Sequence, residues 1–145
     1  MSTSNPDLIE LAREYFRRLD AGSPELLALF AEDSEIYFPK YGIGRGRDQL
    51  LEMVMGLGGA IESVEHDTST YRMTRAGDTV FVEGTTKGVL KSGERWAAGE
   101  TPGGRFCNVF EFRGGLISRL AVYLDPDYGG RDEAGFLWGR SGRTW

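Results

Sequence analysis

The feature that most constrains this chain is a change in the spacing of its apolar residues near Ser63. Before that point apolar side chains recur every three or four residues, as they do on one face of a helix. After it they alternate with polar side chains, as they do along a half-buried strand. Helices followed by a run of antiparallel strands are typical of the α+β class. We therefore predict that N-terminal helices pack on a sheet built by the rest of the chain.

Three helices and one short strand are expected before the change. Residues 6–19 predict an amphipathic helix capped by Asn5, and Ser23 with Pro24 begins a second helix that ends near residues 32–33. A strand over 35–39 and a turn over 42–46 follow. The third helix covers 48–57, because Gly58 and Gly59 interrupt its pattern.

Four strands are expected after the change, over residues 64–75, 79–90, 105–113 and 116–125. Tight hairpins join the first two and the last two, and the stretch between residues 91 and 104 holds an extra strand segment around Trp96 and a Gly/Pro loop. The pattern indicates one domain over residues 1–145, with its core in 6–126 and a tail over 127–145.

Composition excludes several kinds of partner. The net charge of -5 leaves no basic face for nucleic acid or an anionic membrane, so the ligand should be small, apolar and uncharged or weakly polar. One cysteine, Cys107, and one histidine, His66, exclude a disulfide framework and a Cys/His zinc site. We expect no metal and no cofactor. The polar N-terminus and the lack of a long apolar run favour a cytoplasmic location.

Two regions of the chain, residues 27–34 and residues 108–126, carry a resemblance to a known family. Residues 27–34 (LALFAEDS) lead into a strand, and NVFEF at 108–112, GLI at 115–117 and YLDP at 123–126 follow later. Over residues 6–126 the chain resembles the ketosteroid isomerase and SnoaL-like branch of the nuclear transport factor 2-like superfamily. The resemblance implies a cone of helices and curved sheet around an apolar pocket. It also implies a homodimer formed by the outer face of the sheet, where Phe81, Val109 and Tyr123 would be buried.

The resemblance suggests two groups that polarise a carbonyl. Tyr15 falls where ketosteroid isomerases carry the tyrosine that donates to the dienolate oxygen, and Asn108 falls where they carry a protonated aspartic acid. An asparagine amide is a permanent neutral donor, so this pair could polarise a carbonyl group. Each residue also has a structural interpretation, Tyr15 as a core tyrosine and Asn108 as an amide that satisfies buried backbone.

The base of the family is missing, because Phe38 stands before Pro39 where its aspartate would be. Asp125 and His66 are the candidate replacements. Strand parity directs Asp125 outward unless the strand bulges, and it places His66 opposite the apolar pair Tyr71 and Met73. Both therefore also have a structural interpretation.

Epoxide hydrolysis is not expected. The limonene-epoxide-hydrolase relatives need an aspartate, arginine, aspartate set, and the matching positions here are residues 83–86 (EGTT) and Val122.

The function predicted from these residues is a cofactor-independent enzyme that acts on a small apolar carbonyl compound, as an isomerase or a polyketide cyclase does. A binding module and a structural homodimer domain remain as alternatives, since both familiar base positions are lost. The tail aromatics, residues 136–138 among them, should cap the pocket mouth or pack on a partner subunit. The expected pocket lining is Leu19, Phe30, Phe38, Phe106, Phe110, Val122 and Trp138.

Overall fold

The computed structural model describes residues 6–132 and 145, and its framework is a seven-stranded mixed sheet with the order β2-β1-β7-β6-β4-β3, in which β5 pairs with β4. Neighbouring strands are antiparallel except β1 and β7, which run parallel. The strands are β1 (Phe30–Phe38), β2 (Gly42–Arg45), β3 (Ile61–Ala76), β4 (Thr79–Leu90), β5 (Arg95–Ala97), β6 (Arg105–Arg113) and β7 (Leu116–Leu124). The helices are α1 (Leu8–Asp20), the 3-10 helix η1 (Pro24–Leu29) and α2 (Gly46–Ala60).

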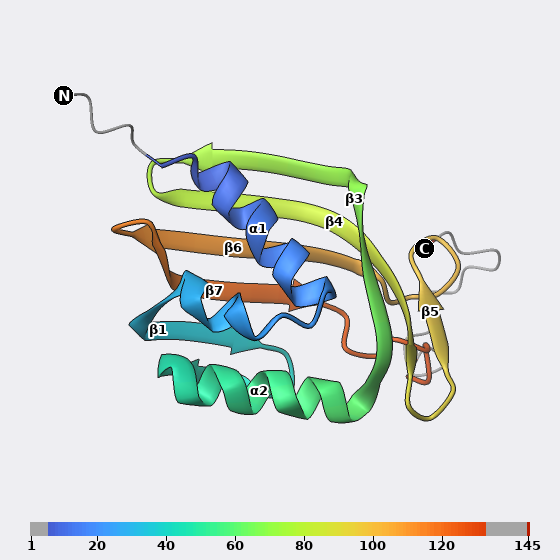
Figure 1. The fold of residues 1–145 in the computed structure, drawn as a ribbon. Coiled ribbons are helices and arrows are strands. Elements are labelled where there is room, and N and C mark those ends of the chain that lie inside the picture. Colours follow the sequence, from blue (N-terminus) through green and yellow to red (C-terminus); the bar gives the residue numbers. More distant parts are fainter. Residues whose placement is uncertain (1–5, 133–144) are drawn as a thin grey trace.

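The helices cover one face of this curved sheet. Figure 1 shows α1 lying across the strands, α2 beside β1, and β3 bending from the end of α2 to the far edge of the sheet. The predicted α+β class, with helices packed on a curved sheet, is confirmed. Within the described residues no helix is both long and apolar enough to cross a membrane.

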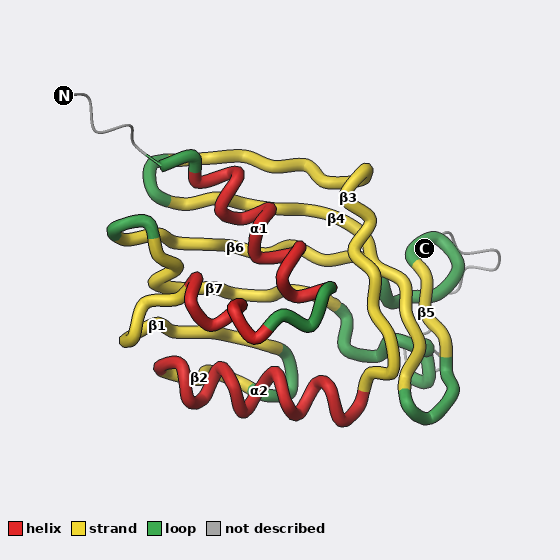
Figure 2. Tube along the Cα trace, viewed as in Figure 1, coloured by secondary structure: helices red, strands yellow, loops and turns green. Residues whose placement is uncertain are grey.

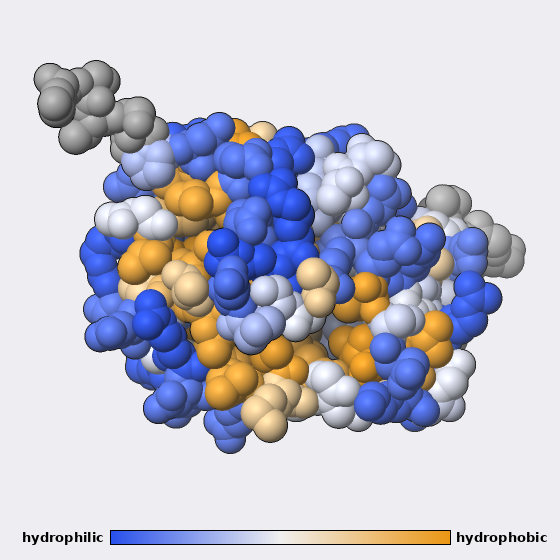
Figure 3. All heavy atoms as spheres, viewed as in Figure 1, coloured by the Kyte–Doolittle hydropathy of each residue, from blue (hydrophilic) through white to orange (hydrophobic). Residues whose placement is uncertain are grey.

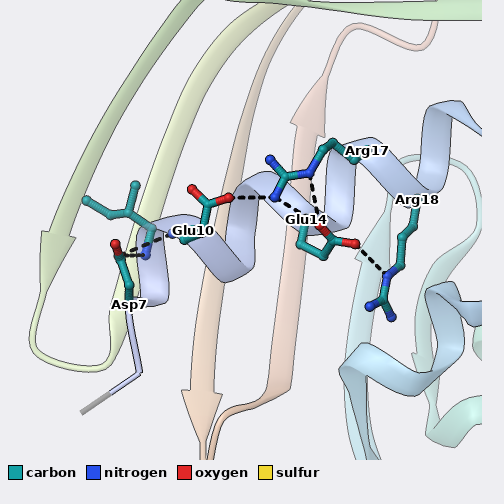
Figure 4. A network of polar contacts seen from close by, with 6 residues as sticks. Asp7, Glu10, Glu14, Arg17 and Arg18 are labelled. Carbon is teal, nitrogen blue, oxygen red and sulfur yellow. Dashed lines mark hydrogen bonds and ion pairs between the residues drawn. The ribbon is translucent and has the colours of Figure 1, made fainter. Parts of the chain in front are cut away.

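Helix α1 begins at a different cap from the one predicted. The carboxylate of Asp7 accepts hydrogen bonds from the backbone N–H groups of Ile9 and Glu10, at 3.1 and 3.2 Å (Figure 4). A carboxylate at this position satisfies N–H groups that have no partner inside the helix. Asn5, the expected cap, lies outside the described residues.

Charged pairs cover the outward side of α1. Arg17 contacts Glu10 at 2.5 Å and Glu14 at 2.9 Å, and Arg18 contacts Glu14 at 2.8 Å (Figure 4). Pairs this exposed stabilise a helix only weakly, because solvent and salt screen their charges. They keep the outer side hydrophilic, as Figure 3 shows, so the opposite, apolar side of the helix faces the sheet.

The second predicted helix is shorter than expected. Ser23 caps it as predicted, with its hydroxyl accepting from the N–H of Glu25 at 3.2 Å, but η1 ends at Leu29. Phe30 already pairs with Ile117 of β7, so the strand begins five residues before the predicted start at residue 35. Pairing with a central strand of the sheet outweighs the helical periodicity of this stretch.

The turn and the third helix also differ from the prediction. The segment predicted as a turn over 42–46 includes β2, an edge strand paired with β1. Helix α2 runs to Ala60 through Gly58 and Gly59, which were expected to end it. Glycine lowers helix stability by about 1 kcal/mol relative to alanine but does not prohibit helix, so packing of Leu50 and Met53 can hold the helix together.

The core lies between the helices and the concave side of the sheet. Alternate residues of β6 face it, and they are Phe106, Asn108, Phe110 and Phe112. Asn108 is the polar member of this row, with an exposed fraction of 3%. Among the other fully buried side chains are Phe16, Phe30, Ile36, Leu50, Val80, Val82, Ile117 and Leu120.

Candidate functional site

A cavity of about 500 Å³ opens between α1, α2 and the sheet. Most of its lining is apolar. The polar and charged residues that line it are Tyr15, Asp20, Glu62, Ser63, His66, Thr86, Asn108 and Tyr128, together with the indole of Trp96. Ligand pockets typically have this composition, a large apolar surface with a few polar groups that orient the ligand.

Tyr15 and Asn108 both line this cavity, one from α1 and the other from β6. The ring of Tyr15 is held edge-on against Phe30 and Phe110, with ring centroids 6.1 and 5.2 Å away. Burial raises the pKa of Tyr15 above its ordinary value, and the negative charge of Asp20 adds to the shift. The phenol therefore stays protonated and able to donate a hydrogen bond.

The amide oxygen of Asn108 lacks a hydrogen-bond partner in the part of the chain that the structure describes. This oxygen is also buried. A buried amide without a partner is unfavourable by about 1–3 kcal/mol. Such a group in a cavity wall is typical of a site whose missing partner is a ligand or water.

His66 forms the closest polar contact in the cavity wall. Its Nδ1 lies 2.5 Å from Oδ1 of Asp20, and its backbone N–H donates to Oδ2 of the same carboxylate at 3.1 Å. The imidazole is 11% exposed and packs against the rings of Phe16 and Phe106. A carboxylate at Nδ1 fixes the tautomer with the proton there, so Nε2 is the nitrogen left for a ligand.

The prediction that His66 and Tyr71 lie on opposite faces of β3 is wrong. Asp67 pairs with Thr85 and Arg72 with Glu83, so β3 advances five residues where β4 advances two. This irregularity reverses the alternation of side chains. Both rings therefore pack against Phe16 and Phe106 on the inner side of the sheet.

The bulge has a signal in the sequence, the polar run over residues 67–70 (DTST) inside a predicted strand. The carboxylate of Asp67 accepts from the backbone N–H of Ser69 at 3.0 Å and from its hydroxyl at 2.6 Å. Short polar side chains that bond the local backbone in this way compete with regular strand pairing.

Asp20 is a site residue that the sequence analysis missed. It is the last residue of α1, where a negative charge is opposed by the negative end of the helix dipole. Two hydrogen bonds from His66 offset this cost. An acidic residue at a helix C-terminus, against the usual preference, was the signal that could have singled it out.

Asp125 is not part of the cavity wall. It follows the end of β7 and is exposed, and its carboxylate accepts a hydrogen bond from the backbone N–H of Asp127 at 2.9 Å. The strand does not bulge at this end, so the parity that directs Val122 inward leaves Asp125 outside. The structure thus removes Asp125 from the candidate bases.

The expected lining is only partly right. Leu19, Phe38, Phe106 and Val122 line the cavity, but Phe30 and Phe110 are each 0% exposed and pack behind Tyr15. Trp138 and the predicted aromatic cap over 136–138 lie outside the described residues.

The described part of the tail closes one side of the cavity through Tyr128. Figures 1 and 2 show the loop after β7 running to the side of the sheet where β5 lies. There Tyr128 packs on Trp96 with ring centroids 4.6 Å apart, and both rings line the cavity. Burial raises the pKa of Tyr128 to about 12, so its hydroxyl is neutral at physiological pH.

Within residues 6–132 and 145 no group of three or more His, Cys, Asp or Glu side chains is placed to hold a metal ion. Among the residues that the structure describes, two carboxylates line the cavity, those of Asp20 and Glu62, and no lysine or arginine does.

Comparison with known proteins identifies the family. The model of the SnoaL-like domain matches residues 12–120, so the chain belongs to the SnoaL-like family. No curated protein matches the sequence significantly.

Solved structures share the fold at low sequence identity. A nuclear transport factor 2-like protein of unknown function from Burkholderia pseudomallei matches with a TM-score of 0.70 and 18% identity, over 83% of this chain and 92% of that one. A proposed polyketide cyclase from Xanthomonas campestris matches with a TM-score of 0.71 and 18% identity, over 81% and 90%. An epoxide hydrolase of M. tuberculosis, described as LEH-like, matches with a TM-score of 0.65 and 18% identity, over 84% and 85%. These likenesses place the chain in the nuclear transport factor 2-like fold.

Proposed function

We propose that this protein is a cofactor-independent enzyme that transfers a proton on a small, largely apolar carbonyl compound, as an isomerase or a polyketide cyclase does. One observation carries the proposal. The His66–Asp20 pair lines the same cavity as two neutral groups, the phenol of Tyr15 and the amide of Asn108. A base and a neutral polar group that face one apolar cavity are the two components that enolate chemistry requires.

The proposed reaction begins at Nε2 of His66, which takes a proton from the carbon next to the substrate carbonyl. The electron pair of that C–H bond forms a carbon–carbon double bond, and the carbonyl π electrons move to the oxygen. The hydroxyl of Tyr15 and the amide N–H of Asn108 donate hydrogen bonds to this oxygen. The proton then returns to a different carbon in an isomerase. In a cyclase the enolate carbon attacks a second carbonyl, whose π electrons move to its oxygen, and this oxygen takes the proton from His66.

Asp20 makes His66 suited to this role. Its carboxylate holds the proton on Nδ1, and its negative charge stabilises the imidazolium that forms when Nε2 takes a proton. In this mechanism Asp20 is a positioning residue, because it acts through the imidazole.

The similar solved structures are described with different activities. The neighbours described as a polyketide cyclase and as an epoxide hydrolase indicate that this fold accommodates different reactions, so the site must decide between them. We favour carbonyl chemistry, because Val122 occupies a position where the epoxide hydrolase set needs a carboxylate and no arginine lines the described cavity.

Exchange of α-protons for deuterium tests the proposal. The ketone 2-tetralone in D2O, followed by NMR, should exchange faster with the protein than in buffer alone. The variant His66→Gln should lower the protein-dependent rate about 100-fold or more, the usual range for loss of a general base. The variant Thr79→Val, at the far end of β4 and outside the cavity lining, should exchange like the wild type.

Two outcomes would contradict the proposal. Unchanged exchange in His66→Gln would remove the histidine from the reaction. Binding of the ketone without any exchange, measured by calorimetry on the same sample, would identify the protein as a binding module.

A further inference from the structure

The side of the cavity next to β5 carries an aromatic wall that the proposed proton transfer does not use. The indole of Trp96 is 2% exposed and packs against the ring of Tyr128, and both belong to the lining. Aromatic rings that line a cavity stack favourably on a flat ring, beyond the burial of apolar area alone.

The wall is held in place by the backbone around it. Trp96 lies directly over Gly88 of β4, where an added Cβ would come within 2.2 Å of the indole. Gly103 lies against the backbone of Tyr128, because a Cβ there would lie 2.8 Å from Cα of Tyr128. Glycine at both positions lets the two aromatic residues approach this closely. An ion pair between Arg131 and Glu94 also ties the loop that carries Tyr128 to the start of β5.

Thr86 adds a hydrogen-bond donor beside this wall. Its Oγ1 accepts the indole N–H of Trp96 at 3.0 Å, and within the described residues its own hydroxyl proton has no acceptor. A hydroxyl whose lone pair is engaged in this way is oriented and keeps one proton to donate. Thr86 lines the cavity and is the direct cross-strand partner of His66.

We infer that Trp96, Tyr128 and Thr86 form a ring-binding subsite for a flat aromatic or conjugated ring that carries a neutral oxygen substituent. The ring stacks on the aromatic wall and its oxygen accepts the hydroxyl proton of Thr86. The subsite extends the cavity of the proposed function, so its role in catalysis rests on that function, but ring binding itself does not. Because Thr86 lies across from His66, a ring bound here places its neighbouring substituents at the proposed base.

Charge excludes acidic ligands from the subsite. The charged side chains of the lining are those of Asp20 and Glu62, and no cation of the described chain faces the cavity to compensate a carboxylate or phosphate on the ring. The oxygen substituent is therefore a hydroxyl, ether or carbonyl group.

Two matched naphthalenes test the inference in a calorimetric titration. The probes are 2-methoxynaphthalene and 2-ethylnaphthalene, which differ by an oxygen in place of a methylene and carry no other oxygen. The wild-type protein should bind the methoxy probe about 3- to 10-fold more tightly, the range for one neutral hydrogen bond. In Thr86→Val the two affinities should become equal, and in the control Thr79→Val the difference should persist. Tyr128→Leu should weaken binding of both probes.

Equal affinities in the wild type, a preference that persists in Thr86→Val, or no binding of either probe would each overturn the subsite. These results are independent of the exchange experiment. If the Thr86-dependent preference is present but no proton exchange occurs, the proposed function fails and the subsite stands. If proton exchange occurs without the Thr86-dependent preference, the subsite fails and the proposed function stands.

Discussion

Tyr71 has a buried hydroxyl that accepts and donates no hydrogen bond within the described chain. Its ring packs against Phe16 and Phe106, at centroid distances of 5.0 and 5.9 Å. Burial raises the pKa of Tyr71, and the negative charge of Asp20 raises it further. The ring stabilises the core, whereas the hydroxyl adds an unsatisfied polar group to it.

The variant Tyr71→Phe should therefore be as stable as the wild type at pH 7, or more stable by up to about 1 kcal/mol. The folded-state pKa of Tyr71 is raised above the unfolded value of about 10. The folded state favours the neutral phenol, so the stability linked to its protonation is present in full below pH 10 and is lost as the pH rises further. The variant lacks the phenol and should lose less stability than the wild type in that range. Urea unfolding at pH 7 and pH 10.5 measures both effects.

A loss of more than about 1 kcal/mol in Tyr71→Phe at pH 7 would contradict this interpretation and show that the hydroxyl has a stabilising partner.

Single residues were predictable where the local pattern is regular. Strand parity placed Asn108 with Phe106 and Phe110 on the side of β6 that faces the helices, which is where the structure has them. The same argument failed for His66, because the bulge over residues 67–72 reverses parity within β3. Asp20 could not be paired with His66 from sequence, since the two are 46 positions apart and meet only through the packing of α1 on the sheet.

At the scale of elements, α2 contains three glycines that packing does not require. A Cβ added at Gly56, Gly58 or Gly59 would meet no heavy atom within 4 Å, and none of the three has a positive φ. They therefore lower the stability of the helix without allowing any close approach.

Gly56→Ala should raise the free energy of unfolding by about 0.5–1 kcal/mol, because alanine favours the helix and restricts the unfolded chain. Urea unfolding measures the change. Gly88→Ala is the contrasting variant and should be strongly destabilised, because its Cβ would lie 2.3 Å from the backbone oxygen of Ser63. A destabilised Gly56→Ala would indicate that this part of α2 is packed against something outside the described chain.

Element types were largely predictable, and the exceptions share a cause. The β4, β6 and β7 strands follow regular alternation, and their structural bounds agree with the prediction to within one residue. The predicted strand over 35–39 matches the second half of β1, but its first half and β2 were not predicted as strand. β1 is stabilised by parallel pairing with β7, a strand about eighty residues further along the chain. Contacts at that separation leave no local signal in the sequence.

For the whole molecule, we propose that the outer face of the sheet forms a homodimer. Phe81 on β4 is 40% exposed and Tyr123 on β7 is 49% exposed, and Val109 lies directly opposite Phe81 on the strand between them. Apolar side chains that are adjacent on an exposed face favour association, and a second copy of the same face would bury them.

Light scattering at micromolar concentration should give the mass of a dimer. Phe81→Glu should shift it to that of a monomer, because a charge would be buried in the interface. Met55→Glu, on the outer side of α2, should leave the mass unchanged although Met55 is 69% exposed. A wild-type monomer, or a dimer that tolerates Phe81→Glu, would contradict the proposed interface.

The central claim, that His66 and Asp20 act together as the base of the cavity, is tested most directly by a double-mutant cycle on the rate of deuterium exchange into 2-tetralone. When two residues act as a unit, replacing either one removes most of the effect of both. The rate losses of the two single variants are therefore not additive in the double variant. Asp20→Asn should lower the rate about 10-fold or more by removing the charge that stabilises the imidazolium, and His66→Gln should lower it further. The double variant should exchange no more slowly than His66→Gln alone. A double variant whose loss is the product of the two single losses, or an Asp20→Asn protein with the wild-type rate, would contradict the claim.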